Sequence, residues 1–166
     1  MNAQQMHDVV IKPTLELMAQ HGNYNTIHAR QLLLGTLAIE SDMGLYNRQL
    51  NGPAVSPFQI EPPTIFDIAK HWDAFPKMVP IIKQISMLHM SPNADRLVTE
   101  CEVNMRLACL IARGKYAMDS KRLPSFDDKR GLYDYYKRVF NSEAGASTWT
   151  KWCDAWRKNK LDEVVL

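Results

Sequence analysis

The segment between Thr26 and Gly44 constrains the fold of this chain more than any other. A threonine hydroxyl can cap the start of a helix by accepting a backbone N–H, and glycine is the usual residue just past a helix end. The predicted helix is apolar on more than one face, through Leu32, Leu33, Leu34, Leu37, Ala38 and Ile39. A helix of this kind is buried on several sides. We therefore expect it at the centre of a helical core, with Glu40 about one turn before its end.

The remaining apolar residues also recur at helical spacing, and no segment shows the strict alternation of a half-buried strand. The expected helices cover residues 6–18, 64–72, 79–90, 97–111 and 132–139, and a last helix begins at Ser147 or Thr148. Pro13 should start a new helical piece or kink the first helix, and Phe75-Pro76 should end the second. A break at Ser91-Pro92-Asn93 should precede the long helix over 97–111. The loop from about Tyr46 to Pro63 could hold a small hairpin. The 166 residues contain no repeat and no linker, so the sequence predicts a mainly α fold with a single domain over residues 1–166.

Three tryptophans lie on the last predicted helix at spacings of three and four residues: Trp149, Trp152 and Trp156. Such a stripe is typical of an amphipathic helix that packs against a core. Sugar binding by these rings is the alternative. We expect them to dock the terminal helix.

Charge and cysteine content exclude several kinds of site. The 20 basic and 18 acidic residues give a net charge of +2, whereas binding to phosphate backbones needs a concentrated basic face, so nucleic acid is not an expected partner. On a shared helix, Cys101 and Cys109 would be roughly 12 Å apart along the axis, too far for a disulfide. Cys153 then has no partner, and the five histidines are scattered. We expect free thiols, no metal and no cofactor.

The first residues, MNAQQMHDVV, lack the basic start and continuous apolar core of a signal peptide. No apolar run has the length of a membrane span. We expect a protein made in the cytoplasm, with no membrane span.

Glu40 is the strongest candidate for a catalytic group. Its apolar neighbours and its place near the negative end of a helix dipole would both raise its pKa. A carboxylic acid that keeps its proton near neutral pH can deliver it to a glycosidic oxygen. The alternative is a glutamate at a helix end that points into water.

Short motifs follow Glu40 in a definite order: Glu40-Ser41 closing the helix, Pro57-Phe58-Gln59-Ile60 in the loop, Pro62-Pro63-Thr64 at the next helix start, Asn104 on a core helix, and Phe140-Asn141 shortly before Ala144-Gly145. This order resembles the lytic transglycosylase and goose-type lysozyme superfamily. The C-terminal motif, YYKRVFNSEAGAST, is similar to that of uncharacterised bacteriophage proteins of this size. The resemblance covers roughly two thirds of the chain.

The resemblance implies a lysozyme-like fold and cleavage of peptidoglycan glycan strands, with Glu40 as the catalytic residue. It implies contacts with the sugar or with Glu40 for Ser41, Gln59, Phe58, Asn104 and Asn141. For Ser41 and Gln59, local capping and loop stabilisation is the alternative. The loop position of Phe58 favours exposure.

Other aromatic residues, Tyr46, Tyr135 and Tyr136, could offer faces for sugar stacking. Core packing is the favoured role for each of them.

A second catalytic carboxylate is not evident. Asp42, Glu61 and Asp67 are candidates, but their spacing places none of them opposite Glu40. A two-carboxylate glycosidase needs such a partner at a defined separation. Lytic transglycosylases avoid this need because the substrate's own groups stabilise and trap the cation as an anhydro-sugar. Hydrolysis by water, as in the goose-type enzymes, remains open.

The sequence departs from the superfamily pattern in three places, of which Ser56-Pro57 and Phe140 support a second hypothesis. Ser56-Pro57 stands where a glycine is usual, Phe140 replaces a tyrosine whose hydroxyl lies near the catalytic carboxyl, and the paired loop glycines are reduced to Gly52. The alternative is a virion structural or assembly protein that keeps the fold with little or no activity, and whose partners are other virion proteins. As an enzyme, the protein would reach the host cell wall after lysis or from the virion.

Overall fold

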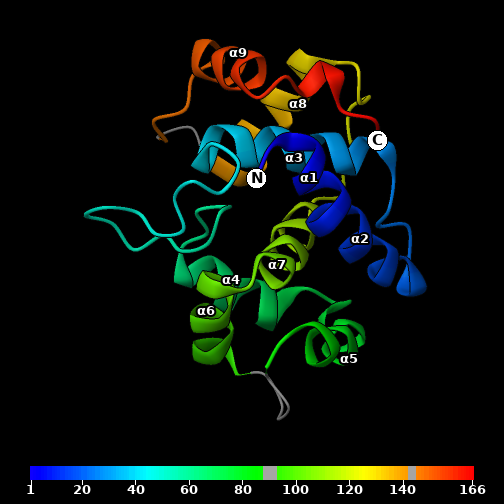
Figure 1. Ribbon diagram of the computed structural model, residues 1–166. Helices are drawn as coiled ribbons and strands as arrows, with labels where there is room; N and C mark the ends of the chain where they lie inside the picture. The colour runs from blue at the N-terminus through cyan, green and yellow to red at the C-terminus, as the bar shows by residue number, and fades with distance from the viewer. Residues whose placement is uncertain (88–92, 142–144) are drawn as a thin grey trace.

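The computed structural model describes residues 1–87, 93–141 and 145–166 and is mainly helical, as the sequence predicts (Figure 1). The helices, including short π-helical and 3-10 turns labelled η, are α1 (Ala3–Met6), η1 (His7–Ile11), α2 (Lys12–Met18), η2 (Ala19–His21), α3 (Ile27–Ser41), α4 (Pro62–His71), α5 (Phe75–Ile85), α6 (Ala94–Val103), α7 (Met105–Ala117), α8 (Lys129–Tyr136), η3 (Lys137–Asn141), α9 (Trp149–Lys158) and η4 (Leu161–Glu163).

The loop after α3, which could have held a small hairpin, contains no paired strands among the described residues. In the described chain, the loop has isolated antiparallel bridges from Val55 to Arg48 and to Ile60, but no strand. Each bridge pairs a single residue with a single partner, so neither forms a ladder.

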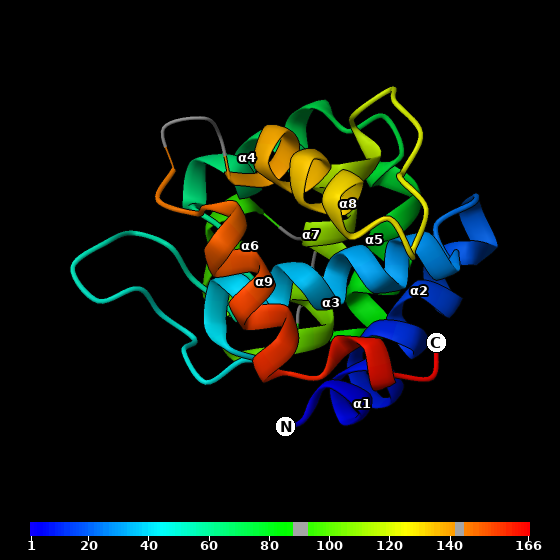
Figure 2. The same ribbon diagram turned by 90° about the horizontal axis from the view of Figure 1, so that it is seen from above.

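Helix α3 is the central element, as predicted. It lies between α8 and α9 on one side and α2 on the other (Figure 1), and α9 crosses its C-terminal end in the view from above (Figure 2). The Thr26 hydroxyl accepts a hydrogen bond from the backbone N–H of Ala29 at 3.1 Å and so caps its start. Helix α3 therefore fixes the position of Glu40 from inside the core.

The end of α3 differs from the prediction. The helix stops at Ser41 rather than at Gly44, because Asp42 already adopts the left-handed conformation with φ 52°. Aspartate tolerates this conformation better than most residues. The Asp42 carboxylate is also held by Lys158 at 2.5 Å and by Asn159 at 3.0 Å. These bonds tie the end of α3 to the end of α9.

The terminal helix α9 docks on α3, which confirms the role expected for its tryptophans. Trp152 and Trp156 are buried, and a Cβ added at Gly35 would lie 2.4 Å from Cη2 of Trp152. Only glycine permits this approach. The partly buried Trp149 packs against Tyr133 with ring centroids 5.5 Å apart.

The predicted long helix over 97–111 is wrong, because it breaks at Asn104 into α6 and α7. Asn104 has extended backbone angles, and its side-chain oxygen accepts hydrogen bonds from the N–H groups of Arg106 and Leu107, each at 3.1 Å. It thus caps the start of α7. Cys101 and Cys109 lie on different helices as a result, and the three cysteines are free thiols, as expected.

Proline positions confirm one predicted helix start and correct another. Pro13 follows a π-helical turn and lies in the first turn of α2, where its missing N–H is tolerated, so it starts a new helical piece as predicted. Phe75-Pro76 begins α5 rather than ending α4, which stops at His71. Helix α5 ends at Ile85. The predicted end at Met90 and the break at Ser91-Pro92 lie outside the described residues.

Among the described residues, no helix is long and apolar enough to cross a membrane.

Candidate active site

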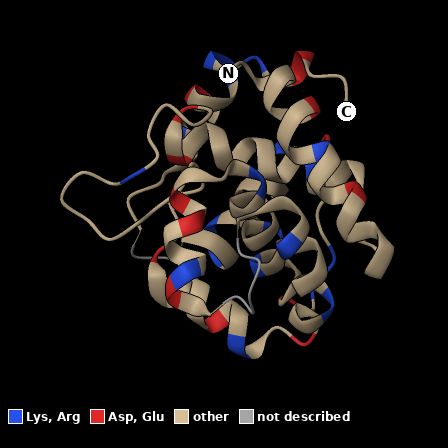
Figure 3. Ribbon diagram, turned by 60° about the horizontal axis from the view of Figure 1, so that its bottom comes forward, with Lys and Arg blue, Asp and Glu red and all other residues tan. Residues whose placement is uncertain are grey.

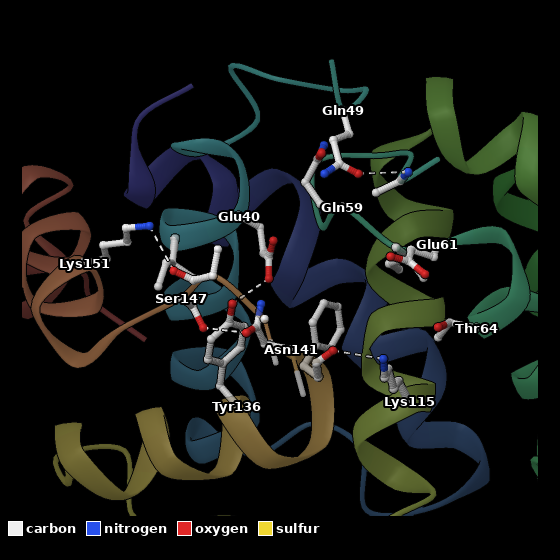
Figure 4. Close-up of a pocket in the computed structure, with 16 residues that line it drawn as sticks. Glu40, Gln49, Gln59, Glu61, Thr64, Lys115, Tyr136, Asn141, Ser147 and Lys151 are labelled. Atoms are coloured by element: carbon white, nitrogen blue, oxygen red, sulfur yellow. Dashed lines mark hydrogen bonds between the residues drawn. The ribbon is translucent and has the colours of Figure 1, made fainter. Parts of the chain in front are cut away.

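A solvent-open cleft of about 690 Å³ lies beside the C-terminal end of α3. One wall is the loop that leads into α4 (Figure 4). The opposite wall has described residues from the end of α8, from η3 and from the start of α9: Tyr136, Phe140, Asn141, Gly145, Ala146, Ser147 and Lys151. Helix α7 contributes Lys115, and α3 contributes Glu40. The cleft therefore brings together residues from both halves of the chain around Glu40.

Glu40 is partly buried in the last turn of α3 and is held by Tyr136. The phenol of Tyr136 donates a hydrogen bond to Oε1 of Glu40 at 2.6 Å. Burial raises the pKa of Glu40, while hydrogen bonds from Tyr136 and Asn141 and the charge of Lys115 lower it in part. The net rise has the direction predicted from the sequence, and desolvation is its largest cause. Such a carboxyl group can carry a proton into a reaction near neutral pH.

Tyr136 is positioned by aromatic packing. Its ring lies 5.1 Å from that of Trp152 and 6.2 Å from that of Phe140, measured between centroids. Burial raises the pKa of the Tyr136 phenol far above its usual range, so the hydroxyl stays protonated and acts as a donor. Core packing was the role favoured for Tyr136 from the sequence, and its contact with Glu40 was not foreseen.

Phe140 lacks the hydroxyl that the resemblance places near the catalytic carboxyl. Its ring instead stacks on Tyr116 at 5.2 Å. Tyr136, which precedes Phe140 by one turn, supplies a hydroxyl to Glu40. The departure at position 140 therefore leaves Glu40 with a phenolic hydrogen-bond donor.

The π-helical turn η3 sets the direction of Asn141. In an α-helix, residues five apart point about 140° away from each other. The wider π turn, with i to i+5 hydrogen bonds, brings Asn141 round to the side of Tyr136. The Asn141 oxygen accepts hydrogen bonds from Ser147 at 2.7 Å and Lys137 at 2.9 Å. These bonds orient the amide that reaches Glu40.

Gln59 lies in the cleft, as expected of a substrate-binding residue. Its side-chain amide donates to the carbonyl oxygens of Ser56 at 2.8 Å and Tyr46 at 3.3 Å. The loop-stabilising role that was the alternative for Gln59 is thus present in this structure. Its side-chain oxygen has no hydrogen bond to another described residue.

Three other candidate residues lie outside the cleft lining. The Ser41 hydroxyl is buried and accepts a bond from the N–H of Gly44 at 2.9 Å, the local capping role considered above. Phe58 is 0 % exposed and belongs to the core, so the expected exposure is wrong. The Asn104 amide donates to the carbonyl oxygen of Ile85 at 2.7 Å in addition to capping α7. None of these three side chains hydrogen-bonds to Glu40 in the described part of the chain.

The loop between α3 and α4 is held by a tight turn. Val55 and Ile60 exchange backbone hydrogen bonds of 3.0 and 2.9 Å. Ser56, at the place of a usual glycine, has φ 74° and so adopts the left-handed conformation that glycine favours. The backbone thus keeps the glycine-type geometry despite the substitution. The side chain of Phe58 anchors the same turn in the core.

Of the other carboxylates considered, only Glu61 lines the cleft. Asp42 is paired with Lys158, and the exposed Asp67 is paired with His71 at 2.8 Å. The described part of the chain has no cluster of three or more histidine, cysteine, aspartate or glutamate residues that could hold a metal ion. Basic and acidic positions are interspersed along the helices (Figure 3). Because their charges largely offset one another, the residues of the cleft set its local charge.

Two cleft residues, Lys115 and Lys151, carry no sequence signal that would assign them to a site. They come from α7 and α9, at opposite sides of the cleft with Glu40 between them (Figure 4). No known protein family, curated protein or solved structure matches this chain. Its function must therefore be inferred from the residues of the cleft.

Proposed function

We propose that this protein cleaves the glycan strands of peptidoglycan, with Glu40 as its one acid/base catalyst. The observation that carries the proposal is a partly buried carboxyl group of raised pKa, held by Tyr136 beside an open cleft. The motif order from Glu40 to Asn141 supplies the substrate class by resemblance. The cleft has a volume suited to a bound oligosaccharide segment.

In the proposed reaction, protonated Glu40 donates its proton to the oxygen that links N-acetylmuramic acid to N-acetylglucosamine. The bond from the anomeric carbon to this oxygen breaks and leaves a sugar cation. The Glu40 carboxylate then accepts a proton from the attacking hydroxyl. The Tyr136 phenol stabilises the carboxylate between the two steps through its hydrogen bond, and the nearby Asn141 amide also lowers the pKa of Glu40.

Two products are compatible with a single carboxylate. Attack by the sugar's own hydroxymethyl group gives an anhydro-muramyl end, and attack by water gives a reducing end. Glu61 is the one other carboxylate among the described cleft residues. It does not hydrogen-bond to Glu40. We propose that Glu40 performs both proton transfers. The protein would act on the host cell wall either after lysis or from a virion.

The test is turbidity loss of purified Gram-negative sacculi, followed by mass analysis of the products. The wild type is expected to clear the suspension, and Glu40→Gln is expected to lose the activity. Glu16→Gln, an exposed site on α2, is the matched control and should behave as the wild type. Anhydro-muramyl ends would identify a lytic transglycosylase, and reducing ends a muramidase.

No clearing by the folded wild type on accessible sacculi would contradict the enzyme proposal. It would favour the alternative of a virion structural protein with a lysozyme-like fold.

A further inference from the structure

Lys115 places a partly buried ammonium group in the cleft, on the far side of Asn141 from Lys151 (Figure 4). Its Nζ donates a hydrogen bond to the carbonyl oxygen of Phe140 at 3.0 Å and lies 4.9 Å from the centroid of the Phe140 ring. These contacts fix the direction of the side chain. They leave it at the surface of the cleft rather than in the core.

The ammonium group has unused bonding capacity. An ammonium carries three N–H donors. Among the described residues, the Phe140 carbonyl is the only hydrogen-bond acceptor of Lys115, and no carboxylate forms an ion pair with it. Burial lowers the pKa of Lys115, and the more distant charges of Glu40, Glu61 and Asp67 raise it in part. A partly desolvated cation with free donors is a favourable partner for an anion.

The charge of the cleft depends on the proton of Glu40. Among the described residues, the charged members of its lining are Glu40, Glu61, Lys115 and Lys151. When Glu40 is protonated, as the proposed reaction requires, Glu61 is the one carboxylate of this set that opposes its two lysines. These four described residues then carry a net positive charge. This charge would attract an acidic ligand more strongly than a neutral one.

We propose that Lys115 binds a carboxylate carried by the glycan strand, and so selects acidic over neutral amino-sugar polymers. This inference rests on the proposed function. The lactyl group of N-acetylmuramic acid ends in a carboxyl group, which is free in strands without peptides and is an amide where a peptide is attached. The attached peptide carries carboxylates of its own. Chitin-type oligosaccharides carry neither.

Binding measured in the Glu40→Gln background separates recognition from catalysis. Isothermal titration calorimetry would compare three ligands: a peptide-free tetrasaccharide with free lactyl groups, the same tetrasaccharide with peptides, and neutral chitotetraose. We expect an acidic ligand to bind about 10- to 100-fold more tightly than chitotetraose, the range of a charge-assisted hydrogen bond. Adding Lys115→Met should reduce its affinity to the neutral level and leave chitotetraose unaffected.

Two further variants control for structure. Lys115→Arg keeps the charge and should keep the preference. Lys77→Met removes an exposed lysine of α5, outside the cleft, and should change nothing. Circular dichroism and thermal unfolding would establish that each variant is folded.

The possible outcomes separate the two proposals. Equal affinity for acidic and neutral ligands, unchanged by Lys115→Met, would overturn this inference alone. Failure of the Glu40→Gln protein to bind any of the three would contradict the glycan-cleaving function as well. Loss of affinity for the peptide-free ligand would assign the carboxylate to the lactyl group, and loss confined to the peptide-bearing ligand would assign it to the peptide.

Discussion

The phenol of Tyr136 donates a hydrogen bond of 2.6 Å to Oε1 of Glu40, across 96 positions of sequence. The bond joins the last turn of the central helix to the end of α8. It stabilises the charged form of Glu40, against the effect of burial. Tyr136 therefore both orients the acid and limits the rise of its pKa.

Replacing Tyr136 by phenylalanine should lower kcat about 10- to 100-fold, because the carboxylate formed on proton donation loses a charge-assisted hydrogen bond. The pKa of Glu40 should rise further, since this bond lowers it. The alkaline limb of the activity profile should then move to higher pH. The measurement is kcat against pH on soluble glycan strands.

Tyr135→Phe is the matched control for this variant. The Tyr135 hydroxyl donates to the carbonyl oxygen of Lys121 at 3.2 Å and does not contact Glu40. Its pH profile should match that of the wild type. Identical profiles for the two variants would show that the Tyr136 hydroxyl has no influence on the reacting group.

Glu40→Gln should stabilise the protein at neutral pH. Because burial raises the folded-state pKa of Glu40 above its unfolded value, the folded chain holds this proton to higher pH than the unfolded chain. The corresponding stability is present below the unfolded pKa and is lost as the pH rises through the folded pKa. Glutamine stays neutral and can still accept the hydrogen bond from Tyr136. We expect a gain of about 1 kcal/mol at pH 8.

Thermal unfolding of both proteins between pH 4 and pH 8 measures this gain. The difference in Tm should shrink as the pH falls toward 4.5, the ordinary pKa of a glutamate side chain. A difference that stays constant with pH would contradict the pKa shift.

Gly35→Ala should destabilise the protein by about 1–3 kcal/mol, because overpacking forces neighbouring elements apart. The added Cβ would lie 2.4 Å from the Trp152 ring, which is itself buried between α3 and the aromatic residues of α8. Urea denaturation gives the free energy of unfolding. Trp152→Phe removes the contacting ring atoms. Gly35→Ala should therefore destabilise the Trp152→Phe protein less than the wild type, by about 1 kcal/mol in a double-mutant cycle. Strict additivity would exclude the steric explanation.

Asn104→Ala should reduce stability by about 1 kcal/mol, the usual effect of losing a helix cap. It should leave KM unchanged, because the Asn104 side chain caps α7 and bonds Ile85 rather than lining the cleft. Asn104→Asp, which keeps the accepting oxygen, should lose less stability. A raised KM with wild-type stability would restore the substrate-binding role that the sequence motif implies.

Local signals made much of the fold predictable. Thr26 and Thr148 cap α3 and α9 as expected, because the capping residue and the apolar pattern that follows it agree. Asn104 was not predicted to break a helix, since the apolar spacing continues through it without a change of period. Gly44 was predicted as the helix end because glycine is the commonest left-handed residue. The bonds from Lys158 and Asn159 that favour Asp42 come from a distant segment.

The candidate site was predictable only where chemistry is local. Glu40 was identified from the motif order around it, because its apolar neighbours and its place near a helix end alone fit a solvent-facing glutamate as well. Tyr136 and Lys115 reach the cleft through packing between distant helices, which no spacing in the sequence encodes. Phe58 was expected to be exposed because it lies in a loop, but the tight turn around it places its ring in the core.

The π-helical turn at Lys137–Asn141 has a consequence for how this site can vary in evolution. Inserting one residue into an α-helix rotates everything after it by about 100°. A π turn absorbs the extra residue locally and preserves the phase of the flanking contacts. Tyr136 and Asn141 thus both keep facing Glu40. The segment between them has one more residue than an α-helical turn, and its sequence can vary. In relatives without the insertion, the tyrosine and the asparagine are expected four positions apart rather than five.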